Sequence, residues 1–151
     1  MDMLMALAVS IGVLIAVWVK VGAMASLAVP AGIVAWACFF AAGGKTMGLQ
    51  KTIASNLSGV IWVWLAMTLI GAMNMGNIAW IIIGVVAFLL VIQSKVAILS
   101  FIPGAFCGAA VTAWAAPTDP KGYVMVAVAL VAGAVLGYVS EMGAGLIAKK
   151  A

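Results

Sequence analysis

Long apolar stretches separated by short polar breaks make up most of the chain. The breaks contain Gly, Pro, Asn or Lys, as turns usually do. A helix that spans a bilayer needs about 20 mainly apolar residues. Six segments approach this length: Met3–Val19, Ala23–Ala42, Thr52–Met73, Ile78–Ile92, Val96–Ala116 and Tyr123–Ile147. The pattern predicts an all-α polytopic membrane protein with six transmembrane helices, forming a single membrane domain over residues 1–151.

Composition strengthens this interpretation. Of the 151 residues, 68% are hydrophobic and 7% are charged, whereas soluble domains are about 25% charged. A chain this apolar cannot hide its surface from water, so the lipid bilayer is its expected partner. No break is long enough to form a soluble catalytic domain, and we therefore do not expect an enzyme.

The positive charges are all lysines, and they are scattered over breaks and ends. Nucleic-acid binding would require a clustered basic stripe, so no nucleic-acid partner is expected. If there are six spans, the termini share one side of the membrane with the second and fourth breaks. That side carries Lys45, Lys51, Lys95, Lys149 and Lys150, and the other side carries Lys20 and Lys121. The positive-inside rule then predicts that both termini are cytoplasmic.

Cys38 and Cys107 both lie in apolar stretches, and the chain contains no histidine. A structural zinc site needs about four ligands, mostly Cys or His. The two cysteines are therefore interpreted as small buried residues, and neither a metal nor a cofactor is predicted.

Two prolines occupy matching places in the second and fifth apolar segments. Pro30 and Pro103 are 73 positions apart, and proline in a helix removes a backbone donor and clashes with the preceding turn. The spacing predicts helices broken at both prolines and two candidate repeats, 3–73 and 76–146. Three spans per repeat would make the halves inverted, as in many transporters. The alternative is a pair of simple packing kinks.

Small residues recur at four-residue spacing in several segments. Gly104 and Gly108 form a G-x-x-x-G pattern, as do Gly133 and Gly137, and Ser55 with Gly59 is a related pair. Such pairs let membrane helices approach closely. We expect the second, third, fifth and sixth segments to form a tight core, and we also expect a homo-oligomer.

Aromatic and polar residues within the apolar segments are candidates for a solute path. Trp36, Phe39 and Phe40 have i, i+3 and i+4 spacing. One helical face would therefore carry these three large aromatic side chains. A narrow aromatic constriction is one way in which pores exclude ions. Buried packing and hydrogen bonds between helices are the alternatives. The candidate path residues are Trp36, Phe39, Phe40, Asn56, Trp62 and Thr112.

Glu141 is the one acid well inside an apolar segment. An ionisable group at such a position is a functional-site hypothesis by default, and Glu141 could couple transport to protons or cations. The alternative is an interfacial acid paired with a lysine such as Lys149 or Lys45.

The number of apolar segments, the short breaks and the sequence "WACFFAAGGK" at 36–45 resemble the YcdZ-like bacterial inner-membrane proteins, a family defined by a domain of unknown function. The resemblance implies a bacterial inner-membrane location and says little about activity. The six-span plan is also similar in outline to acid-gated urea and amide channels, although no residue motif of those channels is present.

Together these patterns favour a channel or facilitator for a small polar, uncharged solute of the urea, amide or ammonia class. A coupled transporter that uses Glu141 is the first alternative. A scaffold or accessory protein that does not transport is the second, although no soluble domain is visible to serve as its effector surface.

Overall fold

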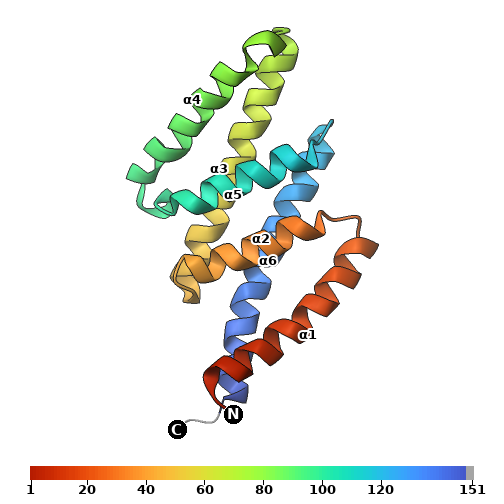
Figure 1. The fold of residues 1–151 in the computed structure, drawn as a ribbon, viewed down its shortest axis with the longest axis vertical. Helices are drawn as coiled ribbons and strands as arrows, with labels where there is room; N and C mark the ends of the chain where they lie inside the picture. The colour runs from red at the N-terminus through yellow and green to blue at the C-terminus, as the bar shows by residue number, and fades with distance from the viewer. Residues whose placement is uncertain (149–151) are drawn as a thin grey trace.

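The computed structural model describes residues 1–148, which contain six α-helices and no strand. Three short 3₁₀ segments, Gly76–Ile78, Gln93–Lys95 and Ala97–Leu99, flank the fourth helix and the turn after it. The six helices, shown in Figure 1, are α1 (Met3–Met24), α2 (Val29–Ala41), α3 (Lys45–Ala72), α4 (Ala79–Ile92), α5 (Ile102–Ala115) and α6 (Pro120–Ile147).

Four of the helical segments are long and apolar enough to cross a membrane alone: Met3–Met24, Lys45–Ala72, Gly76–Lys95 and Pro120–Ile147. The other two, α2 and α5, have 13 and 14 residues. At about 1.5 Å per residue each is only about 20 Å long. The predicted all-α membrane fold is confirmed, but the prediction of six full-length spanning helices is not, because two apolar segments form short helices.

The structure corrects the predicted position of the prolines within their helices. Pro30 and Pro103 lie in the first turn of α2 and α5, where the missing N–H removes no helical hydrogen bond. The chain leaves the helical path before each proline, at residues 25–28 and 96–101. Each apolar segment is therefore interrupted ahead of its proline, and the proline lies in the first turn of the helix that follows.

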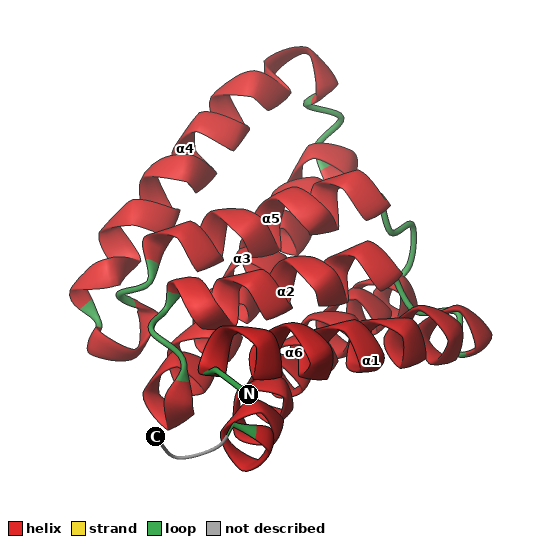
Figure 2. Cartoon of the chain, turned by 60° about the horizontal axis from the view of Figure 1, so that its bottom comes forward, coloured by secondary structure: helices red, strands yellow, loops and turns green. Residues whose placement is uncertain are grey.

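The two halves of the chain interlock through reciprocal contacts. The short helix α2 packs mainly on α6, and the short helix α5 packs mainly on α3. Likewise α1 lies on α6, and α4 lies on α3. In Figure 1 the short helices run side by side through the centre, with α1 below them and α4 above. Figure 2 shows α4 at the edge of the bundle, and only 6% of its segment is buried.

Glycines allow the short helices to approach the long ones. A Cβ added to Gly59 would collide with the carbonyl oxygen of Ala105 on α5, and one added to Gly133 would collide with the carbonyl of Gly32 on α2. Gly108 meets the backbone of Asn56 in the same way. The expected tight core of α2, α3, α5 and α6 is confirmed. Because these small-residue faces are used within one chain, a homo-oligomer stays a prediction that they do not support.

Indole rings fill the space on the α2 side of the core. Trp18 and Trp36 are both buried, and the Trp18 Nε1 group donates to the carbonyl of Val29 at 3.1 Å.

Cys38 is buried and Cys107 is half-buried, and both thiols are free. The interpretation of the cysteines as small packing residues is therefore consistent with their places in the fold.

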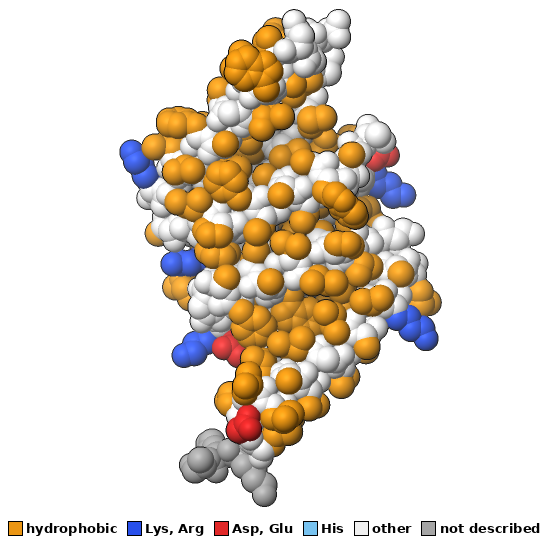
Figure 3. Space-filling model, viewed as in Figure 1, with side chains coloured by type: hydrophobic (Ala, Val, Ile, Leu, Met, Phe, Trp, Pro, Cys, Tyr) orange, Lys and Arg blue, Asp and Glu red, His pale blue; other side chains and the backbone are white. Residues whose placement is uncertain are grey.

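The lysines and most of the helix junctions lie at two opposite edges of the molecule, while the α3–α4 junction lies at the top of Figure 1. Figure 1 places the α2–α3 and α4–α5 junctions at one edge, and the α1–α2 and α5–α6 junctions at the other. In the space-filling view of Figure 3 the lysine side chains lie along these edges, and the visible face between them is largely apolar. This distribution fits a protein that crosses the bilayer from one edge to the other.

The glycine contacts lead to a test of the core with a matched pair of variants on α3. We expect Gly59→Ala to lower the thermal unfolding midpoint in detergent, because overpacking against a backbone costs about 1–3 kcal/mol. Gly71→Ala should leave the midpoint unchanged or raise it, since no atom lies within 4 Å of an added Cβ there. Equal midpoints for the two variants would contradict the described contact between α3 and α5.

Candidate functional site

A stripe of polar side chains lies on the buried face of α3. Thr52, Ser55 and Asn56 are 0%, 0% and 1% exposed. Their i, i+3 and i+4 spacing places them on one side of the helix. The stripe lies where α3 meets α5, because a Cβ on Gly104 would lie 3.2 Å from the Cβ of Ser55. We call Thr52, Ser55 and Asn56 the α3 polar stripe.

The polar atoms of this stripe have no hydrogen-bond partner among residues 1–148. They are the hydroxyl oxygens of Thr52 and Ser55 and both the Nδ2 and Oδ1 atoms of Asn56. An unsatisfied buried polar group costs about 1–3 kcal/mol. The great majority of buried polar side-chain atoms in proteins are paired. Four unpaired atoms on one helical face therefore require an explanation.

The side-chain amide of Gln93, which also lies beside α3, does have hydrogen-bond partners in this fold. Trp62 Nε1 donates to Gln93 Oε1 at 3.0 Å, and Gln93 Nε2 donates to the Ser58 hydroxyl at 2.9 Å. That hydroxyl donates in turn to the carbonyl of Ser55 at 2.7 Å. These residues form a closed chain of hydrogen bonds between α3 and the end of α4, so both polar ends of the Gln93 amide are engaged.

The buried hydroxyls of Thr112 and Ser140 are also paired. Thr112 donates to the carbonyl of Gly108 at 2.7 Å, and Ser140 donates to the carbonyl of Gly137 at 2.7 Å. Ser140 also accepts a hydrogen bond from Trp36 Nε1 at 3.1 Å, which joins α2 to α6. Back-bonding to the preceding helical turn is the usual solution for Ser and Thr in helices. Thr52 and Ser55 do not use it.

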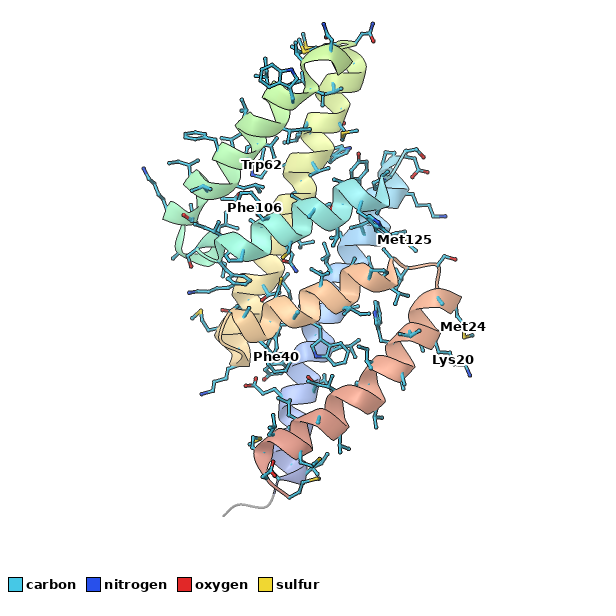
Figure 4. The ribbon with its side chains drawn as sticks, in the orientation of Figure 1. Lys20, Met24, Phe40, Trp62, Phe106 and Met125 are labelled. Carbon is cyan, nitrogen blue, oxygen red and sulfur yellow. The ribbon has the colours of Figure 1, made fainter. Side chains whose placement is uncertain are left out.

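The predicted path residues fall into separate places in the fold. On α2, Trp36 and Phe39 are buried against α6, and the Phe39 ring makes edge-to-face contacts with Phe40 and Tyr138 at centroid distances of 5.1 and 6.2 Å. Asn56 and Thr112 lie on the α3 and α5 side of the core. Figure 4 shows the labelled side chains of Phe40 and Trp62 well apart on different helices. A path lined by the whole predicted set stays a prediction.

Glu141 lies at the amino terminus of α3. Its carboxylate oxygen Oε2 accepts a hydrogen bond from the backbone N–H of Lys45 at 2.7 Å. Gly44, at a φ of 65°, leaves room for this contact, because an added Cβ would lie 2.8 Å from the carboxylate. The partner of Glu141 is thus a helix terminus with its partial positive charge. The other expected partner, Lys149, lies outside the described residues.

A surface pocket of about 710 Å³ lies at the edge of the molecule where the α1–α2 and α5–α6 junctions meet. Its lining includes Ser26, Trp114, Asp119, Lys121 and Met125. The carboxylate of Asp119 accepts from the N–H of Gly122 at 2.7 Å and caps α6. In Figure 4 the labelled Lys20, Met24 and Met125 side chains lie at this edge. The pocket lining thus combines a few polar and charged side chains with a larger number of apolar residues.

Sequence reasoning identified Asn56 but missed the full stripe. The sequence places Thr52 at the start of an apolar segment and Ser55 and Asn56 within it, but of these three only Asn56 is among the predicted path residues. The available signal was the spacing itself, because the stretch 52–56, "TIASN", places three polar side chains on one helical face. The sequence could not show that they lack partners, since that depends on what α5 presents to them.

The chain matches a family model described as "Protein of unknown function (DUF1097)" over residues 8–145. It is 35% identical to the "Inner membrane protein YcdZ" of Escherichia coli K12, over all of this chain and 92% of that protein. It is 32% identical to the Salmonella typhimurium LT2 protein of the same name, over 74% of this chain and 71% of that one. A third relative, the "Uncharacterized protein YahC" of E. coli K12, is 32% identical over 74% of this chain and 69% of its own length.

No solved structure matches the chain significantly. The resemblance indicated by the sequence is confirmed, since both the family model and the relatives match most of the chain. With its long apolar helices and with relatives named as inner membrane proteins, the chain is a multi-pass inner-membrane protein that belongs to the DUF1097 family.

Proposed function

We propose that this protein is a passive facilitator for a small, uncharged, polar solute. The observation that carries the proposal is the α3 polar stripe, with four buried polar atoms that have no partner within residues 1–148. In an apolar membrane protein such atoms are costly, and a solute that hydrogen-bonds to them would remove that cost. Because the stripe contains no charged group, it suits a neutral solute.

The arrangement of the two halves supports a transport role. Each half runs long helical segment (Met3–Met24 or Gly76–Lys95), short helix with proline in its first turn, long helix. Each short helix packs on a long helix of the other half. We propose that the halves are inverted repeats, because three spans per half would reverse the second half in the membrane. Binding sites in transporters of this kind lie at the interface of the repeats. The α3 polar stripe meets α5 at such an interface.

We further propose that both termini are cytoplasmic. Lys45 and Lys51 lie in the first two turns of α3, after the α2–α3 junction, and Lys95 lies at the α4–α5 junction. Lys20 lies near the end of α1 and Lys121 near the start of α6, next to the junctions at the opposite edge (Figure 1). The lysine-rich edge would face the cytoplasm under the positive-inside rule. The pocket beside Asp119 would then open to the outside.

The contacts of Glu141 argue against its use as a coupling site. A coupling carboxylate must lose and regain its charge as solute moves, yet Glu141 accepts a hydrogen bond at the positive end of a helix dipole. Its carboxylate is thus already engaged in capping the amino terminus of α3. We therefore prefer a passive mechanism to the proton- or cation-coupled alternative.

The orientation can be tested with two exposed threonines. In a variant without Cys38 and Cys107, we expect Thr118→Cys to react with an impermeant maleimide added to intact cells. Thr46→Cys should react only after the cells are permeabilised. The substitution is the same at both sites, so a reversed labelling pattern would invert the proposed topology.

Transport can be tested with Thr52→Val, which removes one unpaired hydroxyl and keeps the shape of the side chain. We expect proteoliposomes of the unmodified protein to pass at least one of the neutral solutes urea, acetamide and glycerol faster than protein-free liposomes, and Thr52→Val to slow that flux. Its unfolding midpoint should rise, because an unsatisfied buried group is removed. Thr68→Val, an exposed change on the same helix, is the control. Flux that is unchanged in Thr52→Val would count against the stripe as the site.

The role of Glu141 can be tested in the same liposomes. We expect Glu141→Gln to keep the flux, which should not respond to an imposed proton gradient. The unfolding midpoint should fall, since the lost charge at a helix amino terminus is worth about 0.5–2 kcal/mol. Lys45→Gln should have little effect, because the backbone of Lys45 makes the contact. Gradient-driven flux that disappears in Glu141→Gln would establish the coupled mechanism instead.

A further inference from the structure

Asn56 has more polar groups that need hydrogen-bond partners than either of the other two residues in the α3 polar stripe. Its side-chain amide carries donors at Nδ2 and an acceptor at Oδ1 in one plane. Both atoms are buried and have no partner among residues 1–148.

The amide of Gln93, by contrast, has partners, so the lack of partners is specific to Asn56 and is not general to amides in this region. The Gln93 amide accepts from Trp62 and donates to Ser58, and all three residues lie on α3 or at the end of α4. The same region of the fold thus supplies partners for one amide and none for the other. A merely structural amide at position 56 would be destabilising, since leucine has a similar size and no polar atoms.

Resting on the proposed function, we infer that the solute is a primary amide or urea, recognised by the side chain of Asn56. An amide or urea presents a donor and an acceptor side by side in one plane, as Asn56 does. The two can therefore form a pair of parallel hydrogen bonds. Bidentate contacts of this kind give geometric specificity. The hydroxyls of Thr52 and Ser55 lie on the same face and can accept from the remaining N–H groups of the solute.

Other small solutes fit this chemistry less well. A cation would find oxygen ligands at Thr52, Ser55 and Oδ1 but no carboxylate in the stripe, and the Nδ2 donors would repel it. Ammonia presents a single centre, so it can reach the donor and the acceptor of one amide only through bent hydrogen bonds, which are weaker than linear ones. A polyol such as glycerol has tetrahedral hydroxyls, whose donors and acceptors do not lie in a fixed plane.

Access to Asn56 requires α3 and α5 to separate. The backbone of Asn56 lies against Gly108, and Gly59 lies against the backbone of α5 at Ala105 and Ala109. These contacts leave no room for a solute between the two helices, so the described arrangement is the closed form of the site. Closely packed small residues make such a contact easy to reform after separation, because few side chains need to change rotamer.

The test measures the flux of radiolabelled urea and acetamide into proteoliposomes, with glycerol and methylammonium as comparison solutes. We expect the unmodified protein to carry both amides and to leave glycerol at the protein-free rate. Asn56→Leu should reduce amide flux at least tenfold, while Asn77→Leu, the same change at an exposed asparagine, should not. The unfolding midpoint of Asn56→Leu should be equal or higher, which separates loss of binding from loss of fold.

A competition measurement tests the same proposal with the unmodified protein alone. Its result therefore does not depend on how any variant folds. Excess unlabelled formamide should slow the flux of labelled urea, and the same concentration of glycerol should not. If glycerol is carried and the amides are not, the facilitator stands and amide recognition is wrong. If methylammonium alone is carried, the proposal of an uncharged solute is wrong as well. If no solute exceeds the protein-free rate, both the facilitator and the amide proposal fail.

Discussion

The close approach of helix backbones at glycine holds this protein together. At Gly59 and Gly133 the long helices α3 and α6 lie directly against carbonyl groups of the short helices α5 and α2. In lipid there is no hydrophobic force between helices comparable to that in water, so association depends on van der Waals packing and on hydrogen bonds between helices. Small residues maximise that packing. Because each contact joins one half of the chain to the other, neither half can form its core alone.

The same contacts determine which polar groups are satisfied. Where α3 lies against α5, the neighbouring surface consists of glycine, alanine and backbone already used within the helix, and it offers nothing to Asn56. Where α3 approaches the end of α4, Gln93 reaches Ser58 and Trp62 and closes a network. The tight packing that stabilises the core therefore leaves the α3 polar stripe unpaired. A functional site is a common reason for a protein to retain such a local conflict.

Electrostatics at the helix ends complete the arrangement. The turn between α2 and α3 uses positive φ at Gly43, Gly44 and Lys45, and it places the first N–H of α3 against Glu141 on α6. Asp119 caps α6 within its own turn. Asp2 caps α1 in the same way. All three acids therefore accept hydrogen bonds at helix amino termini. Helix capping accounts for the contacts that each acid of this chain makes.

The sequence by itself determined the membrane environment, the six apolar segments, the short breaks and the small residues of the core. These follow from local composition and spacing, and both are visible in one dimension. The tertiary structure alone decided that Pro30 and Pro103 begin short helices, that Glu141 meets the end of α3, and that Asn56 is unpaired while Gln93 is not. The reason is physical: whether a buried polar atom is satisfied depends on what the facing helix presents, and that helix is about fifty residues away in the chain.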